Sequence, residues 1–157
     1  MGGSSKKQTV GYRYRMGLHL ALCQGPVDAV QEIQMGDRTA WGDADRAPLP
    51  NGHGLTSLSI NKPTLFGGDE REGGVVGTID VLSGHAGQGR NDYLMSRLGA
   101  AIPAFRGVLS LVARKILFAA NNPYIKPWAV RVRRFNAGWH DHAWMGDSEV
   151  RTWDEDE

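Results

Sequence analysis

The chain has 157 residues, a length that favours one domain with a sizeable core, and a formal net charge of only +1. Its single cysteine excludes an internal disulfide and fits assembly in a reducing cytoplasm. No apolar run approaches the roughly 18 residues of a membrane-spanning helix, and residues 1–8 lack the apolar stretch of a signal peptide. We therefore expect a soluble, unsecreted protein that begins with a flexible basic arm over 1–8.

Alternating apolar and polar side chains predict β-strands in the first half of the chain. Every even position from Val10 to Leu22 is apolar, and Gly11 and Gly17 disfavour a helix there. His19 falls on the polar face of this strand, where we expect a structural role for it. The turn Gly25-Pro26-Val27-Asp28 follows. Further strands are predicted over Val30–Met35, Arg38–Trp41, Leu55–Asn61 and Val75–Leu82, the first two as a hairpin around Gly36-Asp37.

Glycine-rich segments separate these strands. Gly42–Gly54 and Pro63–Gly74 are predicted to be loops, and the acidic residues of the second form a solvated tip: Asp69, Glu70 and Glu72. This loop does not fit a phosphate cradle, because it lacks the Lys followed by Ser or Thr of a P-loop and leads into a strand. Gly84–Gly89 is predicted to be a flexible link. Arg90–Leu98 is predicted to be a short helix that ends at Gly99.

The densest apolar content lies in Ile102–Phe135. Val108–Phe118 is apolar on both alternating faces and is predicted to be a strand buried on two sides, although its spacing also allows a short buried helix. Asn121-Asn122-Pro123 is typical of a turn at which the chain doubles back. Trp128–Arg133 alternates as a half-buried strand, so Trp128→Ala is expected to unfold or nearly unfold the domain.

Charge is unevenly distributed along the chain. From Ile102 to Trp139 there are seven Arg or Lys and no acidic residue, whereas Asp147–Glu157 carries six acids against Arg151. Because aromatic side chains alternate with these basic residues, one alternative is a nucleic-acid-binding β-barrel that uses segment 105–135. The other interpretations are the solvated face of a sheet, or a surface that meets an acidic neighbour such as the Asp154–Glu157 tail.

Several separated motifs resemble one known family. Pro103-Ala104-Phe105-Arg106-Gly107, followed by a long apolar strand, an Asn- and Pro-containing turn and a return strand, resembles a motif shared by tail hub proteins of bacteriophages. Met1–Tyr12 and Ala21–Asp28 resemble the start of the tail tip attachment, or host specificity, proteins of long-tailed phages, the J-like proteins of lambda-type tails. The resemblance covers about residues 1–139, and the segment from His140 onward departs from it.

The resemblance implies a mainly β hub domain, barrel-like or sandwich, over 1–139, followed by an acidic tail over 140–157. It implies a structural role in the distal tail tip of the virion, assembled in the bacterial host cytoplasm, in host attachment and genome delivery. Members form a ring of three around the tail axis that contacts distal tail proteins, the end of the tape-measure protein and receptor-binding parts. Because members are usually many hundreds of residues long, we expect either a short natural hub or one whose distal functions lie on another chain.

Two groups of residues follow from this interpretation. The expected assembly residues are Arg106, Arg114, Lys115, Arg131, Arg133 and Arg134. The expected structural residues of the motif are Pro103, Phe105, Gly107, Pro123 and Trp128. Nucleic acid is expected as a partner only where DNA passes through the tail lumen.

Enzyme chemistry has little support in the sequence. His140 and His142 alternate as two metal ligands would, with Asp147 as a conceivable third, but no second ligand cluster accompanies them. Ser83 lacks the glycine of a nucleophile elbow, and Cys23 is expected to be an inert strand residue. We therefore expect no catalytic site, no cofactor and no metal.

Overall fold

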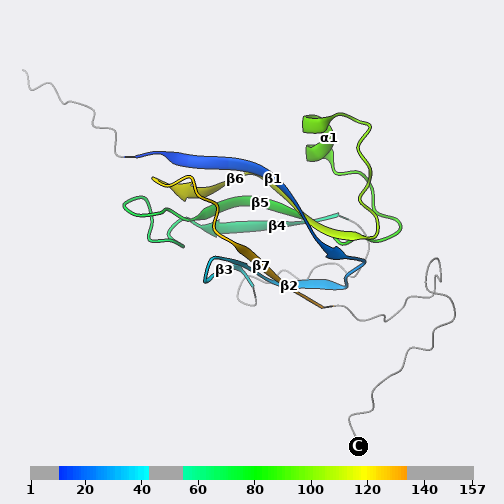
Figure 1. Ribbon diagram of the computed structural model, residues 1–157, viewed down its shortest axis with the longest axis horizontal. Coiled ribbons are helices and arrows are strands. Elements are labelled where there is room, and N and C mark those ends of the chain that lie inside the picture. The colour runs from blue at the N-terminus through cyan, green and yellow to red at the C-terminus, as the bar shows by residue number, and fades with distance from the viewer. Residues whose placement is uncertain (1–10, 43–54, 134–157) are drawn as a thin grey trace, which may run out of the picture.

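The computed structural model describes residues 11–42 and 55–133, which form two facing antiparallel sheets (Figure 1). The four-stranded sheet has the order β1-β6-β5-β4, and the three-stranded sheet has the order β3-β2-β7. Neither sheet closes on itself, so the predicted mainly β fold is confirmed and takes the form of a sandwich. The strands are β1 (Arg13–Gln24), β2 (Ala29–Met35), β3 (Arg38–Trp41), β4 (Leu55–Lys62), β5 (Val75–Leu82), β6 (Val108–Ala120) and β7 (Trp128–Arg133).

The predicted strands all form, with small changes at their ends. β5 has the predicted bounds, and β2 and β3 pair around Gly36-Asp37 as the hairpin that was expected. The predicted strand-or-helix segment at Val108 is a strand, and it continues two residues beyond Phe118. The predicted loop Gly42–Gly54 lies almost wholly outside the described residues, as do 1–10 and 134–157.

A β-bulge at Arg114 and Lys115 divides β6 in two. Pairing with β1 shifts between Met16 and Leu18, and Lys115 has a left-handed backbone with φ +51°. Both neighbouring strands carry a glycine here: a Cβ at Gly77 would lie 2.6 Å from Ile116 Cγ2, and one at Gly17 would lie 2.3 Å from the Tyr93 hydroxyl. Glycine is needed at both positions because the bulged strand and the helix beyond it approach the backbone closely.

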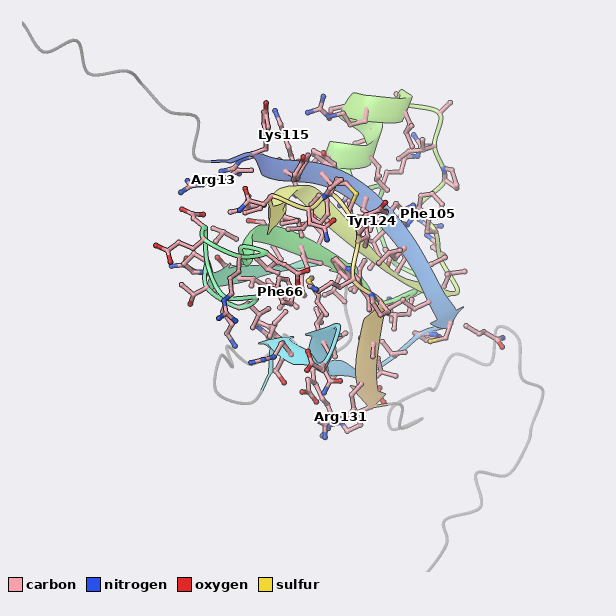
Figure 2. All side chains as sticks on the ribbon, turned by 60° about the vertical axis from the view of Figure 1, so that its left-hand side comes forward. Arg13, Phe66, Phe105, Lys115, Tyr124 and Arg131 are labelled. Carbon is pink, nitrogen blue, oxygen red and sulfur yellow. The ribbon has the colours of Figure 1, made fainter. Side chains whose placement is uncertain are left out.

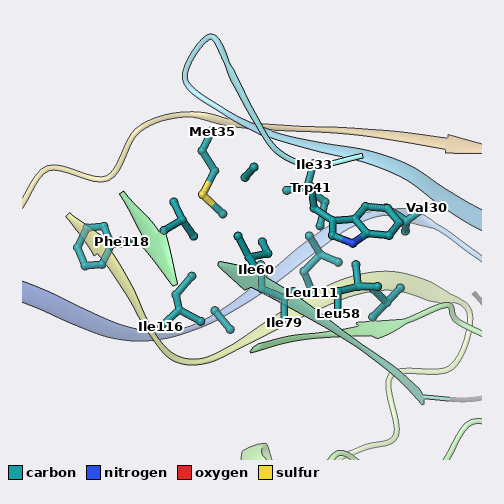
Figure 3. Close-up of a cluster of buried hydrophobic side chains, with 14 of the residues drawn as sticks. Val30, Ile33, Met35, Trp41, Leu58, Ile60, Ile79, Leu111, Ile116 and Phe118 are labelled. Atoms are coloured by element: carbon teal, nitrogen blue, oxygen red, sulfur yellow. The ribbon is translucent and has the colours of Figure 1, made fainter. Parts of the chain in front are cut away.

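The bulge also changes which residues of β6 face the core. Before it, the odd positions Leu109 and Leu111 pack between the sheets, whereas after it the even positions Ile116 and Phe118 do so. Figure 3 shows part of this core, in which side chains from both sheets interdigitate. The largest contributions of the three-stranded sheet are Val30, Ile33, Met35 and Trp41, each at most 4% exposed.

A second, smaller cluster covers the outer face of the four-stranded sheet. The helix α1 (Asp92–Leu98) lies above this face, and its Leu94 packs with Leu82 and Val112 (Figure 1). Asn91 caps the helix by accepting the Leu94 amide at 3.0 Å, and Gly99 ends it as predicted. β6 is therefore covered on both faces, which explains its double-sided apolar pattern.

The chain turns at Asn121 as predicted, but it does not return along β6. β6 belongs to the four-stranded sheet, whereas β7 pairs with β2 in the three-stranded sheet. Residues 121–127 thus carry the chain from one layer of the sandwich to the other. No helix among the described residues is long and apolar enough to cross a membrane.

Candidate assembly surface

Arg114, an expected assembly residue, is used inside the domain. Its Nε donates at 2.7 Å to Asp80, a carboxylate that is 1% exposed and also accepts from Asn91 Nδ2 and Ser57 Oγ, both at 2.6 Å. The other guanidinium nitrogens donate to Asp92 on α1. The hydrogen bonds that Arg114 donates to Asp92 raise the pKa of Arg114 and lower the pKa of Asp92. Arg114 therefore fastens the helix to the sheet.

Arg131 is likewise paired, on the outer face of the three-stranded sheet. Its guanidinium donates to Glu32, which is only 9% exposed. Glu32 also accepts from Thr39 Oγ1 at 2.7 Å and from Gln34 Nε2 at 2.9 Å. The hydrogen bonds from Thr39, Gln34 and Arg131 together lower the pKa of Glu32 to about 2. Three strands are joined through one carboxylate.

The acidic loop between β4 and β5 also finds basic partners. Lys126 donates to Glu72 at 2.6 Å while lying 4.9 Å from the Phe66 ring centroid, and the pairing with Lys126 lowers the pKa of Glu72. At the loop tip, Arg13 of β1 pairs with Asp69. The predicted solvated tip is thus exposed but tied to the sandwich at two places.

Lys115 differs from these residues because it points away from the domain. It is exposed and sits on the bulge of β6, and its side chain has no hydrogen bond or ion pair with any residue of the described ranges. Figure 2 places Lys115 and Arg131 on opposite sides of the molecule, with Phe105 on a third side. The expected assembly residues are therefore divided among separate surfaces rather than gathered in one stripe.

The motif Pro103–Gly107 takes part in a cluster of backbone hydrogen bonds next to β6. Gly107 donates to the Gly84 carbonyl at 2.7 Å, and its own carbonyl accepts from Gly25 at 2.9 Å. The fully buried Gln88 accepts from the Gly84 amide at 2.8 Å and donates to the Ala104 carbonyl at 2.6 Å. Three distant segments are thus held together by the motif, and two of its residues have left-handed backbones, Phe105 at φ +54° and Gly107 at φ +77°.

The side chain of Phe105 adds packing contacts to this cluster of hydrogen bonds. It packs against the second apolar cluster and meets His19 edge to face, with ring centroids 4.5 Å apart. Burial lowers the pKa of His19, and its Nε2 has no hydrogen-bond partner among the described residues. His19 therefore packs as a neutral aromatic ring here, and its predicted structural role fits this position.

A pocket of about 400 Å³ lies at this motif and is lined by Arg90, Pro103, Ala104, Phe105 and Arg106. Each arginine is anchored through one nitrogen: Arg106 Nε donates to the Gln88 carbonyl at 3.0 Å, and Arg90 Nη1 donates to the Ala100 carbonyl at 3.1 Å. No carboxylate of the described residues pairs with either guanidinium. The pocket is consequently positive.

The remaining predicted residues lie around β7. Trp128 and the alternate valines face the core as predicted, but Trp128 is only half-buried. Pro123 is exposed in the corner between the sheets, and Arg133 is exposed, its carbonyl accepting from the Asp28 amide at 3.0 Å. Arg134, His140, His142 and Asp147 lie outside the described residues. Within the described ranges, no three His, Cys, Asp or Glu side chains gather as a metal site would require.

Exposed apolar side chains collect at the end of the sandwich where β1 begins. Tyr12 is 68% exposed, and the corner residues Tyr124 and Ile125 are 79% and 50% exposed. The Asn121 amide donates to the Tyr12 carbonyl at 2.9 Å, so the two segments lie side by side. We call Tyr12, Tyr124 and Ile125 the apolar end.

Sequence reasoning missed Asp80, Glu32 and Arg90. Asp80 had a usable signal, because it interrupts the apolar run Ile79–Leu82, and a carboxylate in such a place is normally paired. Glu32 had none, because other polar residues of β2 lie on both sides of it in the sequence. Arg90 had none, since its role depends on the fold of the 99–107 loop. No protein-family model matches this chain, and a search of curated proteins finds no significant match.

Proposed function

We propose that this chain is a structural hub domain of a phage tail tip that assembles as a homotrimer. The observation that carries the proposal is a combination of open strand edges and exposed apolar side chains in a domain that bears the hub motif. Within the described residues, the edge strands β1, β4, β3 and β7 each have a neighbour on one side only. Unpaired edges invite pairing with other chains, so proteins normally cover them or blunt them.

Two of these edges, β1 and β7, belong to different sheets and carry no proline within the strands. A ring in which each subunit covers an edge of the next would satisfy both, because a heterologous contact that closes gives a cyclic oligomer. The apolar end adds surface that is costly to leave in water. These features support a domain that functions in an assembly.

In the proposed tail tip, the ring lies below the tail tube, surrounds the end of the tape-measure protein and leads into the receptor-binding parts. Its role is to connect and to deliver the genome rather than to catalyse. The internal pairing of Arg114, Lys126 and Arg131 suits this role, because these cations stiffen the domain.

The same pairing weakens the alternative of a nucleic-acid-binding barrel. A phosphate-tracking surface needs cations that are free to displace counterions, and these three are already opposite carboxylates. Titration with single-stranded DNA at several salt concentrations separates the two functions. Tight binding that falls steeply with salt would favour the barrel.

The oligomer is tested by light scattering of the purified full chain across a range of concentrations. We expect a trimer. The double variant with Tyr124→Ser and Ile125→Ser is expected to dissociate it. Leu98→Ser is the matched control, because Leu98 is 67% exposed on α1, away from the apolar end. A monomer at every concentration, or equal effects of both variants, would contradict the proposed assembly.

The location is tested by immunogold electron microscopy of tailed particles from a host that carries the gene. We expect gold at the distal tip of the tail. Gold on the capsid, or particles that form and infect normally after deletion of the gene, would refute the hub role.

A further inference from the structure

Arg90 and Arg106 stand apart from most of the well-placed cations of the domain. Arg13, Arg114, Lys126 and Arg131 each neutralise a carboxylate of the described residues. Arg90 and Arg106 instead donate only to backbone carbonyls, those of Ala100 and Gln88, so their charge is not compensated there. Both line the same pocket.

This pocket has the features of a carboxylate site. A guanidinium offers five N–H groups in a rigid plane, and a single anchored nitrogen leaves the others available while reducing the freedom that binding would cost. Pro103 and Phe105 supply an apolar wall beside the two cations. Such a site would bind a short segment that combines acidic side chains with an aromatic one.

We propose that the pocket binds the acidic segment Trp153–Glu157 of this chain, from the same molecule or from a neighbouring copy. The segment has four consecutive acids directly after Trp153, and it is part of the stretch that holds six acids against one arginine. Paired with the two arginines, the carboxylates would form charge-assisted hydrogen bonds, and the indole would cover the apolar wall.

The length of the connecting chain permits this contact. The 20 residues between Arg133 and Asp154 span roughly 65 Å when fully extended, more than a small domain is wide. The inference is independent of the proposed hub role, since it depends only on the pocket and on the charge of the tail.

A carboxylate ligand fits the observations better than a nucleic-acid phosphate chain does. A strand of nucleic acid requires successive cations along a groove, each contacting a phosphate. Here the two arginines line one pocket, and Arg114 on β6 is already paired with Asp80 and Asp92.

The test is paramagnetic relaxation in the full-length protein. Cys23→Ser removes the exposed native thiol, and Thr152→Cys receives a nitroxide beside the acidic segment. At low salt we expect selective loss of amide signal intensity over residues 99–107, and recovery of that intensity as sodium chloride is added. Uniform broadening, or none in this loop, would overturn the proposal.

Variants show whether the two arginines carry the contact. Arg90→Gln combined with Arg106→Gln should abolish the selective loss, whereas Arg97→Gln combined with Lys115→Gln removes the same charge from other exposed sites and should retain it. If the pocket variant fails to fold, neutralising Asp154, Glu155, Asp156 and Glu157 to their amides tests the same contact from the tail. Broadening that survives either pocket or tail neutralisation would refute the assignment.

Mixing experiments identify the source of the segment and test the rival ligand. Nitroxide-labelled chains without nitrogen-15 are mixed with nitrogen-15 chains without the nitroxide. Broadening in the mixture supports a neighbouring copy, and broadening only within one chain supports the same molecule. A single-stranded oligothymidine that shifts the 99–107 signals, while tail neutralisation leaves them unchanged, would assign the pocket to phosphate and overturn the proposal.

Discussion

The two sheets share one core but differ at their outer faces. The four-stranded sheet is covered there by α1 and the 99–107 loop, and it buries both Leu82 and the carboxylate of Asp80 beneath them. The three-stranded sheet has no element over its outer face among the described residues, and it places Arg131 in solvent. In the first sheet, β6 is therefore constrained on both sides, whereas β7 of the second is constrained on one.

The difference also changes what a polar group contributes. Asp80 is enclosed, so each partner it loses leaves a desolvated charge that water cannot reach. Glu32 is held by three hydrogen bonds, and without Arg131 it still accepts from Thr39 and Gln34. Stability should thus depend on nearly every residue of β6 in the first sheet, and mainly on alternate residues in the second.

The largest loss of stability is expected from replacing a core side chain of the three-stranded sheet. Trp41 is 3% exposed, and Trp41→Ala should cost about 3–5 kcal/mol of unfolding free energy. Trp128 is only half-buried, so Trp128→Ala should cost clearly less than Trp41→Ala, rather than nearly unfolding the domain. Denaturant unfolding of both variants measures the difference, and equal losses would mean that β7 is packed as tightly as β3.

Leucines on opposite faces of the four-stranded sheet test its double burial. Leu111 faces the inner core and Leu82 faces α1, and both are at most 1% exposed. Each change to Ala should cost about 2–5 kcal/mol because it leaves a cavity. If thermal and denaturant melts of Leu82→Ala match those of the parent, α1 does not close the outer face.

Replacing two arginines compares how much a polar cluster on each sheet contributes to stability. Arg114→Ala leaves the buried Asp80 without its cation and should cost about 3 kcal/mol. Arg131→Ala removes a side chain that is 62% exposed and should have a much smaller effect, because Glu32 keeps Thr39 and Gln34. Similar losses in the two variants would remove the distinction between the faces.

The smallest effect concerns acid stability. The folded-state pKa of Glu32, about 2, lies below the ordinary value of 4.5, so its contribution is fully present above about pH 4.5 and is lost as the pH falls toward 2. Glu32→Gln should therefore flatten part of the decline in melting temperature in that range. Glu72 and Asp92, whose pKa values are also lowered, contribute to the decline that remains. An unchanged pH profile would show that these contacts do not lower the pKa of Glu32.

Much of the fold could be predicted because local patterns decide it. Alternation located β1, β4 and β7, and the turn residues located the β2–β3 hairpin and the end of α1. Partner choice could not be predicted, because the residues of Asn121-Asn122-Pro123 indicate a change of direction but not the sheet that the next strand joins. The bulge at Lys115 was also hidden, since a lysine gives no sign of a left-handed backbone.

The candidate surface was harder to predict than the fold. Sequence counts showed an excess of basic residues in 102–139, but pairing partners such as Glu32 lie 99 positions from Arg131 and only the fold brings them together. Arg106 retained an uncompensated charge, and Arg114 and Arg131 did not. The distribution of charge along a sequence therefore predicts poorly which surface charges remain unpaired, because paired residues can lie far apart in the sequence.

The positions of the first and last described strands have a mechanical consequence. Arg13 is paired with Ala120 at one end of the sandwich, and Arg133 is paired with Ala29 near the opposite end (Figure 1). Tension applied between the two ends of the chain would pull along the strands, in the shear direction. Many hydrogen bonds between β1 and β6 would then bear the load together instead of opening one after another, which raises the barrier that governs forced unfolding.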